Sequence, residues 1–277
     1  MIAMKTLTSG LNVLRPFFRS RDWTYKIRQG VAAGLIRKGG FGFIPRALSP
    51  EEKFLLDLDW EGQTIYDVGG YEGIFTLFFA KSVGPAGRVF TFEPNPANCQ
   101  RIRENVLLNR LSNVQLLPLG LGASKGKSKL VFWPDEPARG SMNDSYQESL
   151  RKKRDTVCIE IEIDSLDNQL ASRPLPPPDF IKIDVEAAEL EVLEGMAHTL
   201  KTCQPRLFVE VHSGVDVKQL AQGLLGKGYH LHHIESNMEI DSSNTGRAYN
   251  GHLYCVHRDH LRRNAVESQR EGHRTER

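Results

Sequence analysis

An acidic, glycine-rich turn is the segment of this sequence best suited to binding a small ligand. It reads Asp67-Val-Gly69-Gly70-Tyr71-Glu72-Gly73, and it follows residues 64–68, a short apolar run that predicts a buried strand. Glycine allows the backbone to approach a ligand closely, because no Cβ stands in the way. The spacing does not match the G-x-G-x-x-G pattern of dinucleotide-binding turns. A carboxylate at the strand end repels a pyrophosphate and suits a cationic ligand that carries an amino group.

A second acidic residue stands at the end of the next predicted strand. Residues 88–93 end in Glu93, which lies 20 residues after Gly73. A carboxylate at this position can accept hydrogen bonds from both hydroxyls of a ribose, as in nucleotide sites. The turn and Glu93 together predict a site for S-adenosylmethionine, which carries sulfonium and ammonium charges and a ribose. The alternative is a tight structural turn with a solvated Glu93.

Three further side chains are candidates for catalysis at the ends of later strands. Asp184 and Glu186 end a predicted strand over residues 180–185, and His212 ends another over residues 206–212. Asp184 and Glu186 are positioned to orient or deprotonate an acceptor hydroxyl, and the alternative for Asp184 is a helix cap. His212, with an ordinary pKa of ~6.5, could remove a proton near neutral pH, or it could be structural.

The remaining polar clusters do not predict a site. No metal site is predicted, since His230 and His232 share one face of a strand, His233 takes the other, and no nearby carboxylate completes a ligand set. No G-x-S-x-G elbow supports a hydrolase triad. Glutamates 189, 191 and 194 are expected to form the solvated face of a helix.

Strands and helices alternate along the chain. Strands are predicted at 64–68, 88–93, 114–119, 180–185 and 206–212, and helices at 74–82, 96–109, 188–200 and 217–225. This order predicts a parallel sheet with right-handed crossovers. Residues 157–164 alternate as a half-exposed strand after a polar loop at 134–154, and residues 229–234 and 253–256 close the domain as strands. We expect a basic segment at 1–49, one domain at 50–257 and a polar, frayed tail at 258–277.

Composition and charge narrow the function classes further. The 277 residues are 40% hydrophobic and 25% charged, and no apolar run approaches the ~18 residues of a membrane span. Four separated cysteines and the lack of a signal-like leader predict the cytoplasm. Residues 1–50 hold nine Lys and Arg side chains against Asp22 alone. This segment either contacts an anionic surface or is a solvated arm beside the domain, and no specific nucleic acid is expected.

The chain resembles the FkbM-type S-adenosylmethionine-dependent methyltransferases. Four stretches carry the resemblance: residues 66–73 (YDVGGYEG), 92–96 (FEPNP), 179–186 (DFIKIDVE) and 208–212 (FVEVH). The resemblance implies an α/β fold, a three-layer α/β/α sandwich of the Rossmann-like methyltransferase type, with a mostly parallel sheet and an antiparallel last strand at 253–256. Two departures stand out, because the family usually has Ala-Asn at Gly70-Tyr71 and Gly at Ala187.

The resemblance implies methyl transfer from S-adenosyl-L-methionine to a hydroxyl of a sugar, glycan or secondary metabolite. The expected catalytic residues are Asp184, Glu186 and His212. The expected cofactor contacts are Asp67, Gly69, Gly70, Tyr71, Gly73, Glu93 and Asn95. The alternatives are an NAD(P)-dependent oxidoreductase, a non-catalytic binding module on the same fold, and a nucleic-acid methyltransferase, which only the basic arm supports.

Overall fold

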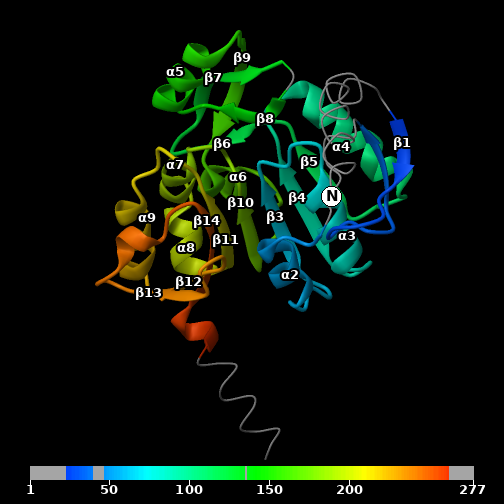
Figure 1. Ribbon diagram of the computed structural model, residues 1–277. Coiled ribbons are helices and arrows are strands. Elements are labelled where there is room, and N and C mark those ends of the chain that lie inside the picture. Colours follow the sequence, from blue (N-terminus) through cyan, green and yellow to red (C-terminus); the bar gives the residue numbers. More distant parts are fainter. Residues whose placement is uncertain (1–22, 40–46, 135, 262–277) are drawn as a thin grey trace, which may run out of the picture.

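A large mixed sheet forms the centre of the molecule (Figure 1). The computed structural model describes residues 23–39, 47–134 and 136–261. The strand order is β13-β12-β14-β11-β10-β3-β4-β5. The bounds are β3 (Thr64–Val68), β4 (Arg88–Phe92), β5 (Val114–Leu117), β10 (Phe180–Ile183), β11 (Arg206–Val211), β12 (Tyr229–His233), β13 (Met238–Ile240) and β14 (Gly251–His257). Strands β11, β10, β3, β4 and β5 are parallel, and β14 runs antiparallel to β11. The mostly parallel sheet and the antiparallel last strand are therefore confirmed.

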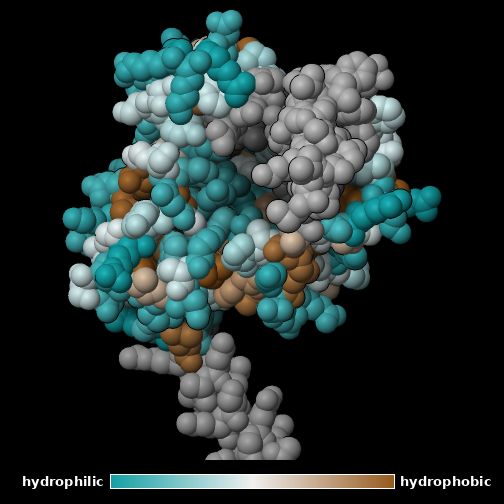
Figure 2. Space-filling view, viewed as in Figure 1, coloured by the Kyte–Doolittle hydropathy of each residue, from teal (hydrophilic) through white to brown (hydrophobic). Residues whose placement is uncertain are grey.

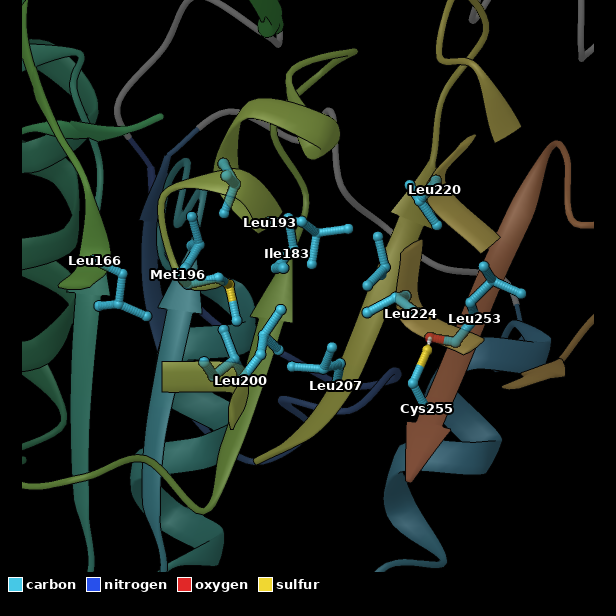
Figure 3. Close-up of a cluster of buried hydrophobic side chains, with 14 of the residues drawn as sticks. Leu166, Ile183, Leu193, Met196, Leu200, Leu207, Leu220, Leu224, Leu253 and Cys255 are labelled. Atoms are coloured by element: carbon cyan, nitrogen blue, oxygen red, sulfur yellow. Dashed lines mark hydrogen bonds between the residues drawn. The ribbon is translucent and has the colours of Figure 1, made fainter. Parts of the chain in front are cut away.

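Helices cover both faces of this sheet. On one face lie α2 (Pro50–Leu56), α3 (Ile74–Ser82) and α4 (Pro96–Leu108), and on the other lie α6 (Leu166–Ser172), α7 (Glu189–Glu194), α8 (Ala197–Thr202) and α9 (Val217–Gly226). Successive residues of a strand point to opposite faces of the sheet. In β3, Ile65 packs on the face covered by α3, and Tyr66 packs on the face covered by α9. Figure 3 shows the hydrophobic core on the face covered by α6 to α9, where Leu193, Leu200 and Leu224 pack on the sheet. The predicted three-layer architecture is confirmed, and no described helix has the length and apolar character needed to cross a membrane.

The predicted helix over residues 188–200 is in fact two helices. Gly195 separates α7 from α8, and a Cβ on this glycine would stand 2.0 Å from the carbonyl oxygen of Gly122. The Gly195 carbonyl also accepts a hydrogen bond from the backbone N–H of Asp167 (3.0 Å). The break therefore lets a neighbouring loop pass close to the helix backbone.

A smaller sheet of four strands lies near the carboxyl ends of the parallel strands of the main sheet (Figure 1). It contains β6 (Gly120–Leu121), β7 (Gly126–Trp133), β8 (Glu136–Ser141) and β9 (Val157–Asp164), with α5 (Asp144–Lys153) packed on it. The prediction of a polar loop over 134–154 is wrong, because this segment forms β8 and α5. Leu150 is the buried anchor of α5, and its carbonyl accepts a hydrogen bond from Trp133 Nε1 (3.1 Å).

Part of the basic N-terminal segment packs against the domain. Strands β1 (Trp23–Lys26) and β2 (Ile36–Gly39) form a hairpin, and Ile27, Val31 and Leu35 between them enter the core on the α3 side. The N–H of Lys38 donates to Asn105 Oδ1 on α4 (2.7 Å). Residues 1–22, and with them much of the predicted basic arm, lie outside the described residues, as does the tail beyond residue 261.

Candidate active site

The glycine turn after β3 brings the ends of three strands together. The N–H groups of Gly69 and Gly70 donate to the carbonyl of Phe92 at the end of β4 (2.9 and 3.2 Å). Gly69 has a φ of +85°, and a Cβ on it would lie 1.8 Å from the Asp184 carbonyl oxygen after β10. Glycine is required here because the backbone of the neighbouring strand fills the space of a side chain. The turn is thus held against both neighbours of β3, where the strand order reverses direction and ligands bind in such sheets.

Glu93 lies beside this turn and is almost completely buried. Its Oε2 accepts a hydrogen bond from the N–H of Tyr71 (2.8 Å), and its Oε1 accepts from the N–H of Asn95 (2.8 Å) and from Asn98 Nδ2 (3.1 Å). Burial raises the pKa of Glu93 to about 7, although these donors favour the charged form. The carboxyl is not a solvated strand end. A carboxylate oxygen accepts two hydrogen bonds, so Oε2 retains capacity for a ligand hydroxyl.

A pocket opens at this point between the two sheets. Figure 2 shows the hollowed and mostly hydrophilic surface between the small sheet and the main sheet. The pocket is lined by Val68, Gly69, Tyr71, Phe92, Glu93, Pro94, Asn98, Gly120, Leu121, Leu130, Met142, Asp184, Val185, Glu186, Glu210 and His212. The structure therefore brings Gly69, Tyr71 and Glu93 into one pocket with all three predicted catalytic residues.

The other four predicted cofactor residues shape the turn and do not line the pocket. Asp67 is fully buried and accepts a hydrogen bond from Thr76 Oγ1 (2.6 Å), and burial raises its pKa. Gly70 packs against β4, and Gly73, with a φ of +87°, precedes α3 as its N-cap. Asn95 caps the N-terminus of α4 through its side chain. Their direct contact with the cofactor stays a prediction.

His212 lies among four carboxylates. Its Nδ1 donates to Oε1 of Glu189 (2.6 Å), and its Nε2 stands 3.4 Å from Glu210, 3.7 Å from Glu186 and 3.8 Å from Asp184. Burial alone would lower the pKa of His212, but the carboxylates of Glu189 and Glu210 raise it to about 11. The ring is therefore an imidazolium at neutral pH. The expectation that His212 titrates near its ordinary pKa is wrong, because the sequence does not show how many acids surround it.

Asp184 is paired with a buried lysine. Lys182 Nζ donates to Asp184 Oδ2 (2.8 Å), and the lysine side chain is only 2% exposed. The alternative that Asp184 caps the next helix is wrong, since α7 has Ala188 as its N-cap and no side-chain cap bond. The expectation of a solvated Glu189 is also wrong, because this residue is fully buried beneath His212.

Glu186 and Ala187 occupy a strained turn after β10. Both have positive φ values, 51° and 75°, a conformation that costs most residues other than glycine ~1–2 kcal/mol. The small sheet holds this turn, since Ser141 Oγ donates to the Glu186 carbonyl and Tyr146 OH donates to Glu186 Oε2 (3.1 Å). Burial raises the pKa of the Glu186 carboxyl to about 7. The departure from glycine at Ala187 thus falls at a left-handed position.

Several residues that build this site were not predicted from the sequence. Glu189 has its partner, His212, on another element, and Lys182 is buried beside Asp184 only once the sheet has formed, so their roles depend on the fold. Tyr146 lies on a helix that was predicted as loop, and nothing in the sequence signalled its contact with Glu186. Residues 210 and 212 are two apart, so the period of a strand puts Glu210 on the same side as His212, and Glu210 also lines the pocket.

The N-terminal hairpin also contacts the glycine turn. Arg37, which is 3% exposed, forms an ion pair with Glu72, the residue that follows Tyr71. Asn105 on α4 connects the hairpin to the glycine turn. Its Nδ2 donates to the Glu72 carbonyl (3.0 Å), and its Oδ1 accepts from the Lys38 N–H (2.7 Å). Arg37 and Lys38 of the N-terminal hairpin thus support the glycine turn.

The chain is similar in sequence to known methyltransferases. Over 170 residues the chain is 30% identical to the hexuronic acid methyltransferase AglP of Haloferax volcanii, covering 61% of this chain and 64% of that protein. It is 31% identical over 191 residues to the methyltransferase sdnD of Sordaria araneosa, covering 60% and 73%. The crystal structure of an FkbM methyltransferase from Methylobacillus flagellatus KT aligns with a TM-score of 0.48 and 17% identity, covering 75% of this chain and 50% of that one.

The family assignment follows from residues 67–238, which match the methyltransferase FkbM domain. This segment begins at the acid of the glycine turn and includes Glu93, Asp184, Glu186 and His212. The match confirms the predicted resemblance, the methyltransferase class and S-adenosylmethionine as the cofactor, and it speaks against the NAD(P)-dependent alternative. The chain belongs to the FkbM methyltransferase family.

Proposed function

We propose that this chain methylates a hydroxyl oxygen of a sugar or secondary metabolite. The observation that carries the proposal is the pocket, in which Gly69 and Glu93 on one side meet Asp184, Glu186 and His212 on the other. Similar proteins support the acceptor class by their names, since one is a hexuronic acid methyltransferase and another is a 31-O-demethyl-FK506 methyltransferase, 24% identical to this chain.

The residues on the β3–β4 side fit S-adenosylmethionine. Glu93 Oε2 has capacity for a ribose hydroxyl, Phe92 and Leu121 offer apolar surface for the adenine, and Gly69 leaves room at the turn. The neighbouring carboxylates favour a cationic ligand. When bound, the cofactor supplies a methyl group activated by a positively charged sulfur.

The residues on the β10–β11 side would hold the acceptor. Asp184 and Glu186 follow β10 and line the pocket. Lys182 donates to one oxygen of Asp184, and Tyr146 donates to one oxygen of Glu186. The second oxygen of either group can accept a hydrogen bond from the acceptor hydroxyl and take its proton. Holding the hydroxyl in place supplies most of the rate enhancement, because the methyl group is already activated.

Transfer of an isotopically labelled methyl group tests this proposal. The full chain is incubated with labelled S-adenosylmethionine and fractionated sugars or small-molecule extracts, and mass spectrometry identifies the labelled product. Asp184→Asn should reduce turnover by ~10²–10⁴, typical of lost acid–base catalysis, while S-adenosylhomocysteine still binds. Glu148→Gln, an exposed change on α5, should leave turnover unchanged. Cofactor binding without any labelled product would favour the non-catalytic binding module.

A further inference from the structure

The acid–histidine cluster of the pocket has the spacing of a metal site. Ligand atoms of Asp184, Glu210 and His212 all lie within 4.8 Å of one another. The 3.4–3.8 Å that separate His212 Nε2 from the facing carboxylates are too long for good hydrogen bonds. Two atoms bound to one cation at ~2.0–2.2 Å would stand about 3–4 Å apart. The distances thus match the ligands of a shared ion better than direct pairs.

The orientation of His212 gives an independent indication. Glu189 is fully buried and fixes the ring through Nδ1, which turns Nε2 toward the pocket. The second oxygen of Glu189 is buried and has no hydrogen-bond partner among the described residues. A buried carboxylate behind a histidine, with the other ring nitrogen facing a set of carboxylates, is the arrangement that orients histidine ligands of metals.

The charges of the cluster point in the same direction. Four carboxylates surround the ring, whereas among the described residues the other cations in contact with them are Lys182 on Asp184 and His252, 3.5 Å from Glu210. A cation bound at Nε2 would displace the proton of the His212 imidazolium, and four carboxylates would then face the two positive side chains of Lys182 and His252. One divalent cation would balance the difference, whereas buried charges without compensation are costly.

We propose that Asp184, Glu210 and His212 bind a divalent cation, with Glu186 within reach as a further ligand. Carboxylate oxygens with one imidazole nitrogen favour Mn²⁺ or Zn²⁺ over Ca²⁺, which takes oxygen ligands alone. The role of the ion rests on the proposed function: it would bind the acceptor hydroxyl and lower its pKa, as metals do for bound water. The prediction of no metal site rested on histidines 230, 232 and 233, and the sequence does not show that Asp184 and Glu210 lie beside His212.

Calorimetry without any acceptor tests this site. The full chain is treated with a chelator, titrated with MnCl₂ and, separately, with ZnCl₂, and the bound metal is counted by elemental analysis. We expect one ion per chain, and at least tenfold weaker binding for His212→Ala and for Asp184→Asn. The control is Glu51→Gln, which disrupts a second group of possible ligands within the described part of the chain, Glu51, Glu235 and His252, and should bind as wild type.

The outcomes separate this proposal from the proposed function. Wild-type protein that binds neither metal, variants that bind as well as wild type, or loss of binding in Glu51→Gln would each overturn the cation site. Binding of S-adenosylhomocysteine by every variant shows that the pocket is folded, and Glu210→Gln replaces any variant that fails this check. Cofactor binding by a chain that binds no metal would leave the methyltransferase proposal intact.

Discussion

Gly69→Ala probes the contact between the glycine turn and the end of strand β10. A Cβ at this position would stand 1.8 Å from the Asp184 carbonyl oxygen, and real Cβ atoms essentially never lie closer than 3.0 Å to such an atom. The atom in the way belongs to backbone, so it cannot rotate aside as a side chain would. The hydrogen bond from the Asp184 N–H to the Val68 carbonyl (3.0 Å) holds the same two strand ends together.

The expected cost has two parts. Alanine at a φ of +85° costs ~1–2 kcal/mol, of which the reduced entropy of the unfolded chain returns ~0.4–1 kcal/mol. Forcing extra volume into a packed site costs a further ~1–3 kcal/mol. We therefore expect Gly69→Ala to lower the free energy of unfolding by about 2–4 kcal/mol.

Gly62→Ala is the matched control. Gly62 also has a positive φ, +72°, but a Cβ on it would meet nothing within 4 Å, so only the backbone cost of ~1 kcal/mol applies. Urea unfolding of the two variants measures the difference. Equal losses for both variants would refute the argument that the Asp184 carbonyl requires glycine at position 69.

Three further predictions concern the surroundings of the pocket. The pKa of Glu93 is about 7 in the folded chain, above its ordinary value of 4.5, so the free energy of unfolding should fall as pH rises between these values. Glu93→Gln should flatten this pH dependence in urea unfolding. An unchanged slope in the variant would count against the buried carboxyl. Ala187→Gly should be neutral or stabilising by up to ~1 kcal/mol in urea unfolding, because it relieves left-handed strain, and a clear loss would contradict that strain. Arg37→Ala should weaken S-adenosylhomocysteine binding about fivefold in calorimetry, because it removes the ion pair that holds Glu72 in the glycine turn. Arg37→Lys should recover part of the lost affinity. Wild-type affinity in Arg37→Ala would show that the hairpin does not support the turn.

The parallel core of the fold was predictable because its strands are short, buried apolar runs separated by helices. Strands β3, β4, β10 and β11 lie within one or two residues of their predicted bounds. The glycine turn and Glu93 could be recognised together, because both follow directly from these strand ends. Local sequence was sufficient to predict those strands whose consecutive residues are all buried.

The small sheet and the electrostatics of the site were not predictable in the same way. Residues 134–154 are mostly polar, and they form β8 and α5 because Trp133 and Leu150 pack on each other from neighbouring elements. Glu189 looks like a surface residue of a helix until β11 brings His212 onto it. Such burial of a charge depends on a partner that is distant in sequence, so periodicity cannot show it.

Titration of the full chain with S-adenosylhomocysteine tests the central claim most directly. We predict one molecule bound per chain in calorimetry, no binding of NAD, and a loss of about 1–3 kcal/mol in Glu93→Ala, the cost of leaving the ribose and turn donors unpaired. Glu148→Ala on exposed α5 should bind as wild type. Binding of NAD in place of S-adenosylhomocysteine, or full affinity in Glu93→Ala, would contradict the assignment of this pocket to the methyl donor.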